Sequence, residues 1–140
     1  MPKIAVLIVI GLLFLLYYLF FYSPYTTIDL TIKSKTFTLE IARTPIQKSR
    51  GLMRRSSLCP TCGMIFVFAQ ESIYPFWMKN TPLPLDIIWL DQNGTVVDIK
   101  TGQPQNTTLL TNTTKAKYVI ETNLDATGLK IGDQVKIPTL

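Results

Sequence analysis

The chain has 140 residues, a net charge of +5 at neutral pH and no histidine. Without histidine it lacks the commonest general base and metal ligand, which excludes Ser-His and Cys-His nucleophile pairs. We therefore predict no catalytic residue, metal site or cofactor, and the mild basic excess lacks the dense basic face that a nucleic-acid partner needs.

The N-terminal segment from Ile4 to Tyr22 contains no charged residue and no Asn, Gln or Ser. About 20 apolar residues in a helix span a hydrocarbon core of roughly 30 Å, so we predict that residues 1–25 form a single transmembrane anchor and short linker. A cleaved signal peptide is the alternative, but signal h-regions are shorter, and Phe20 to Tyr25 is bulky where a peptidase requires small residues. Because a short N-terminus usually stays inside, this signal-anchor topology places the domain outside, with membrane lipid around Ile4 to Tyr22.

Residues 26–140 carry the patterns of short strands and one short helix. Apolar and polar residues alternate from Ile28 to Ile32 and from Phe37 to Ile41, which predicts a β-hairpin with one apolar face. The sequence from Thr44 to Gln47 is a capping box with proline at the first helical position, and Gly51 is a stop signal. A helix of about two turns is predicted between them.

The rest of the domain is predicted to add strands and turns. The predicted strands are Gly63 to Phe68, Leu85 to Leu90, Thr95 to Ile99, Tyr118 to Glu121 and Gln134 to Ile137. The first is apolar on both faces, as in a fully buried strand, and Asn93-Gly94 suits the positive φ of a hairpin turn. These elements predict a mainly β domain, a sandwich or partly closed barrel of about seven to eight short strands with one short helix, preceded by a single transmembrane helix.

The sharpest local pattern is Cys59-Pro60-Thr61-Cys62, which holds both cysteines of the chain. Such a pair forms a structural disulfide or stays as idle thiols, acts as a redox dithiol, or supplies half of a zinc site. A redox cysteine is activated at a helix N-terminus, whereas this pair leads into a predicted strand, and zinc would need ligands from a second chain. These alternatives stay open, and outside a membrane a disulfide that tightens the turn is the simplest.

A second candidate site is the stretch from Phe76 to Asp86, which mixes bulky apolar residues with polar and charged ones. Its candidate binding residues are Trp77, Lys79, Asn80, Thr81 and Asp86. Such a rim fits a polar ligand with apolar faces, for example a sugar or a peptide segment. In the alternative interpretation Trp77 and Met78 belong to the core, Asp86 pairs with an arginine, and the other polar groups satisfy loop backbone.

A third candidate is a cluster of basic residues around Gly51. Its members are Lys48, Arg50, Arg54 and Arg55. Arginine matches carboxylate and phosphate bidentately, so Arg50 and Arg55 join the candidate binding residues. The cluster is equally compatible with a solvated helix end, where cations complement the helix dipole. One of these arginines is expected to pair with Asp86 inside the fold.

Several stretches, taken in order, resemble the domain-of-unknown-function 192 family. They are Arg50-Gly51-Leu52-Met53-Arg54-Arg55, Gly63 to Phe68, Phe76 to Thr81, Leu85 to Ile88 and Gly128 to Asp133. The resemblance covers roughly Thr27 to Ile137 and implies a compact, mainly β domain, often exported or anchored, with no established activity. Members commonly lack cysteines before the Gly-Met-x-Phe strand, so the resemblance implies a structural role specific to this chain for Cys59 and Cys62. Many carry cysteines after the later proline, where Pro104 here leads into Gln, Asn and Thr.

The residues and the resemblance together favour a non-catalytic binding or accessory module at the outer membrane face. Its predicted partner is an envelope polymer or a membrane protein, contacted through the rim around Trp77. The alternative is a thiol-disulfide redox protein that uses Cys59 and Cys62. A third hypothesis, a hydrolase with Asp86 or Lys79 as base, lacks a recognisable nucleophile turn.

Overall fold

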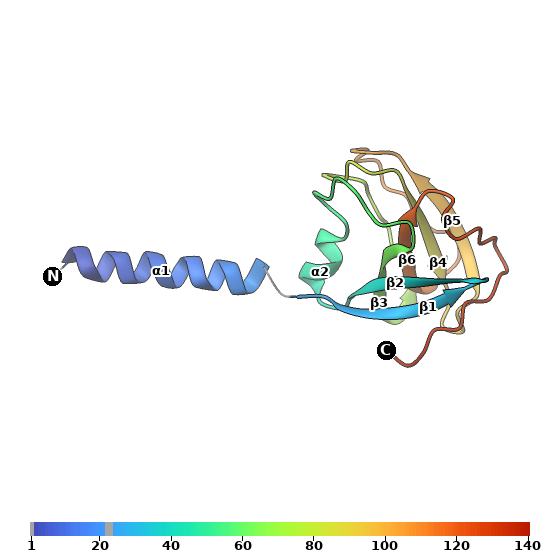
Figure 1. Cartoon of the computed structure of the whole chain (residues 1–140), viewed down its shortest axis with the longest axis horizontal. Helices are drawn as coiled ribbons and strands as arrows, with labels where there is room; N and C mark the ends of the chain where they lie inside the picture. Colours follow the sequence, from blue (N-terminus) through green and yellow to red (C-terminus); the bar gives the residue numbers. More distant parts are fainter. Residues whose placement is uncertain (1, 22–23) are drawn as a thin grey trace.

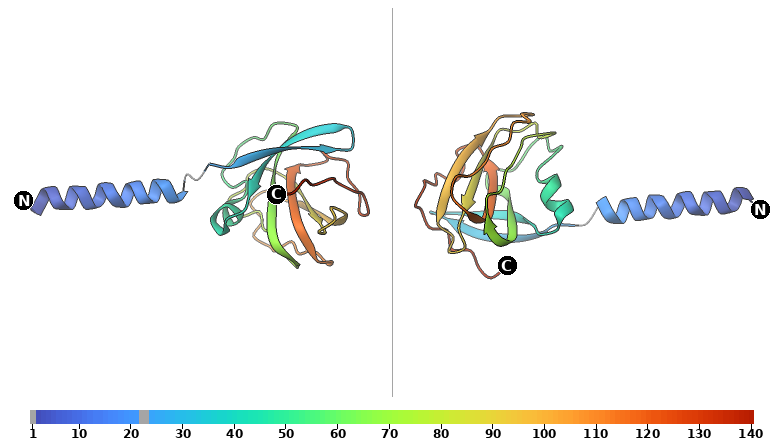
Figure 2. Two further views of the ribbon diagram at one scale, coloured as in Figure 1. Left: turned by 90° about the horizontal axis from the view of Figure 1, so that it is seen from below. Right: turned by 180° about the vertical axis from the view of Figure 1, so that it is seen from behind.

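The computed structural model describes residues 2–21 and 24–140, which form an N-terminal helix and a β domain (Figure 1). The helix, α1, runs from Pro2 to Phe21 and projects away from the β domain in both further views (Figure 2). Large apolar side chains between Val6 and Tyr18 are exposed along it.

The predicted membrane anchor is not supported by the structure. Within residues 2–21 and 24–140, no helix combines the length and apolar character that crossing a bilayer requires. The helix α1 covers the predicted segment only as far as Phe21, and Tyr22 lies outside the described residues. The transmembrane helix, the single-pass location and the lipid contact that we predicted from the sequence are therefore without support here.

Six strands form one mixed sheet in the order β1-β2-β3-β6-β4-β5 (Figure 1). Their bounds are Thr26–Ile32 for β1, Lys35–Ala42 for β2, Cys62–Ser72 for β3, Leu85–Leu90 for β4, Val96–Gly102 for β5 and Ala116–Asn123 for β6. The strands β2 and β3 pair in parallel, and the other neighbouring pairs are antiparallel. The sheet is strongly curved but stays open, with β1 and β5 at its edges.

The prediction of a mainly β domain is confirmed, whereas the sandwich or partly closed barrel of seven to eight strands is wrong. One reason is that the predicted strand Gln134–Ile137 is not part of the sheet. It makes an isolated bridge between Gln134 and Thr95, and the Val135 N–H donates to the Gly94 carbonyl. The segment therefore contacts the β4–β5 turn and does not close the sheet along a free edge.

Apolar side chains are buried on both faces of the sheet. The strand β3 contributes Ile65 to one cluster and Met64 and Phe66 to the other. The second cluster also contains Leu52 and Met78, from the connections on either side of β3. A strand covered on both faces needs apolar residues at consecutive positions, which is the pattern that the sequence showed here.

The short helix α2, Pro45–Arg50, forms as the sequence predicts. The Gln47 N–H donates to Thr44 Oγ1 at 3.2 Å, and Gln47 Oε1 accepts from the Thr44 N–H at 3.1 Å. Gly51 then ends the helix at a φ of +50°, a conformation that side-chain-bearing residues rarely adopt. The turn carries the chain from the helix into the buried Leu52.

The connection between β3 and β4 is fixed by backbone hydrogen bonds to two other loops. Phe76 pairs with Leu110 as an isolated bridge, and the Met78 N–H donates to the Asn106 carbonyl. The Asn80 carbonyl accepts from the Arg54 N–H at 2.7 Å. These bonds hold the segment from Phe76 to Thr81 beside the C-terminal end of α2, where the candidate site lies.

Candidate functional site

A small pocket lies between the end of α2, the strand β3 and the segment that precedes β4. We call it the acid pocket. It is lined by Lys48, Ser49, Arg50, Gly51, Leu52, Met53, Phe66, Phe76, Trp77, Thr81 and Glu121. Its volume is about 20 Å³, and because a water needs roughly 10–15 Å³ by this measure, the pocket admits one small polar group.

The acid in this pocket is Glu121, which belongs to the central strand β6. It lies opposite Met64 of β3 and Ile87 of β4 and is only 5% exposed. The Leu52 N–H donates a hydrogen bond to its carboxyl group, but Oε2 has no partner among the described residues. Burial raises the pKa of Glu121 to about 8, although the Leu52 bond and the nearby Arg55 oppose the shift. The carboxyl is therefore mostly neutral at pH 7.

Gly51 leaves open the space above this carboxyl. A Cβ at this position would lie 3.4 Å from Glu121 Oε2 and 3.3 Å from Phe66 Cζ. Only glycine combines this positive φ with an uncovered approach to the acid. Gly51 thus has a role in the site in addition to ending the helix.

A larger opening, which we call the aromatic groove, adjoins the acid pocket. It is lined by Lys48, Ser49, Phe66, Phe68, Tyr74, Pro75, Phe76 and Trp77, and its volume is about 240 Å³. Five of these residues, Lys48, Ser49, Phe66, Phe76 and Trp77, also line the acid pocket. The two openings are therefore parts of one site, with Glu121 at its inner end.

Ring packing makes the walls of the aromatic groove rigid. Phe68 and Tyr74 stack with ring centroids 3.5 Å apart, and Phe66 meets Phe76 edge-on at 4.9 Å. Phe76 is supported in turn by the fully buried Trp89 at 5.8 Å. Trp77 is different, because 42% of its surface is exposed. The groove thus has rigid aromatic walls and one accessible indole ring, that of Trp77.

Lys48 is a cation shared by the aromatic groove and the acid pocket. Its Nζ lies 4.3 Å from the centre of the Phe68 ring, and burial lowers the pKa of Lys48. No ion pair to Lys48 occurs within residues 2–21 and 24–140. Among the described residues that line the two openings, Glu121 is the only acid.

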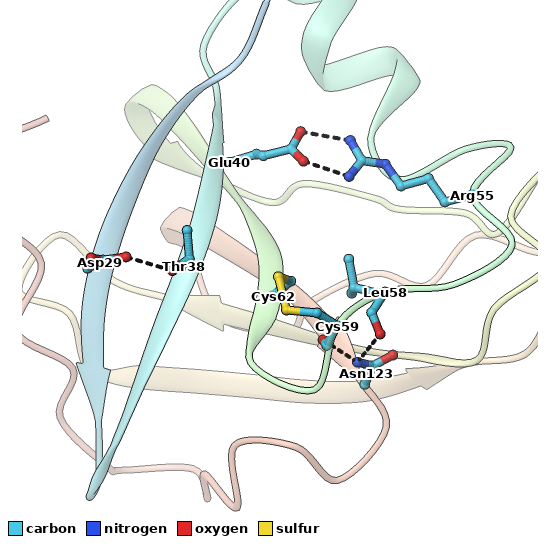
Figure 3. The surroundings of a disulfide bond; sticks show 8 residues. All are labelled: Asp29, Thr38, Glu40, Arg55, Leu58, Cys59, Cys62 and Asn123. Carbon is cyan, nitrogen blue, oxygen red and sulfur yellow. Dashed lines mark hydrogen bonds and ion pairs between the residues drawn. A yellow bond between two sulfur atoms is a disulfide. The ribbon is translucent and has the colours of Figure 1, made fainter.

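Arg55 forms a bidentate ion pair with Glu40. Its two terminal nitrogens lie 2.6 and 2.7 Å from the carboxylate oxygens (Figure 3), and this bond raises the pKa of Arg55. Burial raises the pKa of the neighbouring Tyr25, and Arg50 and Arg55 oppose that shift. The ion pair fixes the Arg55 guanidinium near Glu121, and both carboxylate oxygens of Glu40 accept hydrogen bonds from it.

The structure brings some of the predicted site residues together. Arg50, Trp77 and Thr81 line the acid pocket. Lys79 lies over the Trp77 ring, with Nζ 5.1 Å from its centre. Asn80 is exposed at a φ of +55° and contributes its carbonyl to the loop. The alternative interpretation was thus right that Met78 is core and that the Thr81 hydroxyl bonds loop backbone, since it donates to the Lys79 carbonyl at 3.3 Å, but Trp77 is accessible.

Asp86 lies apart from this group, and the predicted pairing of Asp86 with an arginine is wrong. Its Oδ1 accepts from Thr101 Oγ1 at 3.2 Å, and its Oδ2 accepts from the Asp125 N–H at 2.8 Å. Of the arginines in the basic cluster, Arg55 pairs with Glu40 instead. A hydroxyl and a backbone amide satisfy the buried carboxylate, so it needs no cation.

Glu121 was not among the candidates predicted from the sequence. The available signal was an acidic residue at the end of the apolar run Tyr118–Ile120, which we assigned only as a closing strand. A charged residue in a buried strand is unusual unless it is paired. Only the placement of β6 between β3 and β4 shows that this one is buried.

The cysteines form a disulfide between Cys59 and Cys62, in the turn that enters β3 (Figure 3). The Asn123 side chain donates to the Cys59 carbonyl at 2.9 Å and to the Leu58 carbonyl at 3.2 Å. Neither cysteine lines the acid pocket or the aromatic groove. The described residues also include no group of three His, Cys, Asp or Glu side chains that could hold a metal ion.

The fold and the site define a small open-sheet β domain with one buried acid beneath an aromatic groove. The chain belongs to the DUF192 family, whose model is described as an uncharacterized ACR and matches residues 28–137. The matched region contains the whole site, and the family resemblance predicted from the sequence is confirmed.

Two curated relatives are UPF0127 proteins from Thermococcus species. The protein of Thermococcus gammatolerans is 38% identical over 88 residues, which are 59% of this chain and 53% of that protein. The chain thus spans about half the length of that relative. The protein of Thermococcus sibiricus is 31% identical over 113 residues, 74% of this chain and 69% of that protein.

Two solved structures share the fold. A candidate transcription regulator from Sinorhizobium meliloti superposes with a TM-score of 0.74 at 30% identity, over 80% of this chain and 94% of that one. A protein of unknown function from Novosphingobium aromaticivorans superposes with a TM-score of 0.70 at 34% identity, over 81% of this chain and 85% of that one.

Proposed function

We propose that the domain is a non-catalytic module that binds a small polar ligand with an apolar face, about the size of one sugar ring. The observation that carries this proposal is the continuity of the aromatic groove with the acid pocket. The groove offers ring faces for an apolar surface, and the pocket offers a buried carboxyl for one polar group. Such a combination is typical of sites that recognise amphipathic ligands.

The size of the groove supports a small ligand. Its volume of about 240 Å³ is slightly below that of typical drug-sized sites, roughly 300–1,000 Å³. A single pyranose ring fits this space, with its apolar face against Trp77 and its hydroxyl groups toward Lys48 and the acid pocket. A larger polymer would place one unit in the groove and extend into solvent.

The chemistry of the site favours binding over catalysis. Glycoside hydrolysis, for example, generally uses two carboxyl groups on either side of the bond that breaks. Here Glu121 is the one acid that lines the described site, and the nearby Glu40 is held by both terminal nitrogens of Arg55.

The test uses the two tryptophans of the chain. Trp77 is exposed and Trp89 is fully buried, so a ligand in the groove should change the emission of Trp77 only. We would titrate the full chain with methyl glycosides of neutral and acidic hexoses and confirm each binder by calorimetry. We expect at least one to bind, and Trp77→Ala to weaken it roughly tenfold, since one lost stacking contact costs about 1–3 kcal/mol.

The matched control is Ile131→Ala, which truncates an exposed apolar side chain that does not line the described site. It should leave the affinity unchanged. If no glycoside binds at millimolar concentration, or if both substitutions weaken binding equally, the proposal is wrong.

Thiol-disulfide exchange by Cys59 and Cys62 stays a prediction without a specific observation in its favour. The described disulfide lies in a turn that leads into β3, not at the N-terminus of a helix, so the usual activation of a redox cysteine is missing.

A further inference from the structure

We propose that Glu121 binds the ligand as a protonated hydrogen-bond donor, and that the ligand group it receives is a carboxylate. The inference rests on the proposed function, because it assigns the inner end of the same site. It narrows the ligand from a polar ring in general to an acidic one, such as a hexuronate.

The hydrogen bonds of Glu121 indicate that its carboxyl group donates to the ligand. The Leu52 N–H donates to one carboxyl oxygen, while Oε2 is buried, has no partner among the described residues and lies 3.4 Å from the position that a Gly51 Cβ would take. In the neutral carboxyl, the proton therefore belongs on Oε2, to which no group of residues 2–21 and 24–140 donates. A ligand group that enters the acid pocket meets a donor and must supply an acceptor oxygen.

The buried Oε2 also needs a functional reason. A buried polar atom without a partner costs about 1–3 kcal/mol, and most proteins avoid it. The pocket next to this atom has room for about one oxygen. A ligand oxygen placed there would satisfy an atom that has no partner in the described part of the chain.

The positive charge around the site favours an anionic ligand. Lys48 and Arg50 line the acid pocket, and Lys48 also lines the aromatic groove. A carboxylate can place one oxygen on Glu121, and the cations that line the site then stabilise its negative charge. A neutral hydroxyl would use only the first of these interactions, so cations of this arrangement favour an anionic ligand.

The other charged groups near Glu121 are already engaged or lie at the rim. Arg55, from the α2–β3 connection, is held by Glu40 of β2 and has Tyr25 beside it. Lys79 lies over the Trp77 ring at the outer edge. The residues opposite Glu121 on the neighbouring strands, Met64 and Ile87, are apolar. Glu121 and Lys48 are thus the titratable groups whose protonation should control binding.

The experiment compares two probes that differ only at one carbon, methyl β-D-glucuronide and methyl β-D-glucoside. Binding to the full chain is measured by calorimetry between pH 6 and 9.5. At pH 6 we expect the glucuronide to bind at least about tenfold more tightly, because it alone has the charged acceptor. With a Glu121 pKa of about 8, its affinity should fall about 30-fold between pH 7 and 9.5.

Three variants distinguish the effect of Glu121 on binding from that of Lys48 and from that of the overall charge. Glu121→Gln keeps a donor toward the pocket but does not ionise, so it should bind the glucuronide within a few-fold at pH 6 and lose most of the pH dependence. Lys48→Met keeps the side-chain stem and should weaken the glucuronide but not the glucoside. Lys117→Met removes the same charge from β6 at a position outside both openings, and should change neither.

Equal affinity for the two probes at pH 6 would overturn the inference while leaving the proposed function intact. So would a fall in affinity at high pH that persists in Glu121→Gln, because it would assign the titration to Lys48. If neither probe binds and no other glycoside does, both the inference and the proposed function are wrong.

Discussion

Replacing Glu121 by glutamine should stabilise the fold, by an amount that grows with pH. The amide keeps the shape of the neutral carboxyl and can still accept from the Leu52 N–H. The variant differs from the native chain mainly in that it cannot ionise. Its effect therefore isolates the free energy of burying a charge at this position.

The sign follows from the direction of the pKa shift. The pKa of Glu121 is raised from 4.5 in the unfolded chain to about 8 in the fold. Between these values the folded state binds the proton of Glu121 more tightly than the unfolded chain does. The stability that this proton contributes is therefore complete below pH 4.5 and is lost as the pH rises to 8. Each pH unit corresponds to 1.36 kcal/mol, which gives a loss of about 5 kcal/mol over the whole interval and about 3 kcal/mol at pH 7.

Urea denaturation of both proteins at pH 4.5, 6, 7, 8 and 9 measures this difference directly. The difference in unfolding free energy should be smallest at pH 4.5, reach about 3 kcal/mol in favour of Glu121→Gln at pH 7, and level off above pH 8. Unchanged m-values would show that both chains unfold from comparable folded states. A difference that stays constant across the range would refute the reasoning and mean that Glu121 is ionised and stabilised by Arg55.

Three further substitutions test the supports of the site. Gly51→Ala should cost roughly 1–3 kcal/mol of unfolding free energy because of the positive φ, and it should abolish glycoside binding, measured by calorimetry. Arg55→Met should cost roughly 1–3 kcal/mol by leaving the Glu40 carboxylate without its partner, and in a double-mutant cycle with Glu40→Gln the two losses should not add. Replacing Cys59 and Cys62 together by serine should cost about 2 kcal/mol, since the disulfide closes a very short loop, and should leave glycoside affinity unchanged. Full additivity in the cycle, or loss of binding in the serine variant, would contradict these assignments.

The local elements could be predicted from the sequence because their causes lie within a few residues. The capping box from Thr44 to Gln47 fixes the start of α2, and Gly51 fixes its end. The hairpin of β4 and β5 follows from the turn at Asp91–Gly94, where Gly94 adopts a φ of +82°. The burial of β3 was visible in its unbroken apolar run, since a strand covered on both faces excludes polar residues.

The arrangement of these elements could not be predicted in the same way. Nothing local to β6 shows that it pairs between β3 and β4, or that β2 and β3 run parallel. Only the tertiary structure shows that Gln134–Ile137 contacts the β4–β5 turn and does not extend an edge of the sheet. Pairing between distant strands depends on competition among all exposed edges, which a pattern of a few residues does not contain.

The candidate site shows the same division. The sequence by itself identified the stretches around Gly51 and Trp77 as candidates, because basic residues gather around Gly51 and bulky apolar residues mix with polar ones around Trp77. Only the tertiary structure showed that Glu121 lies beneath these stretches and that Arg55 forms an ion pair with Glu40. A carboxyl group acquires a raised pKa and an open hydrogen-bonding position only when surroundings from distant parts of the chain exclude water from it. The chemistry of this site is therefore a property of the folded sheet.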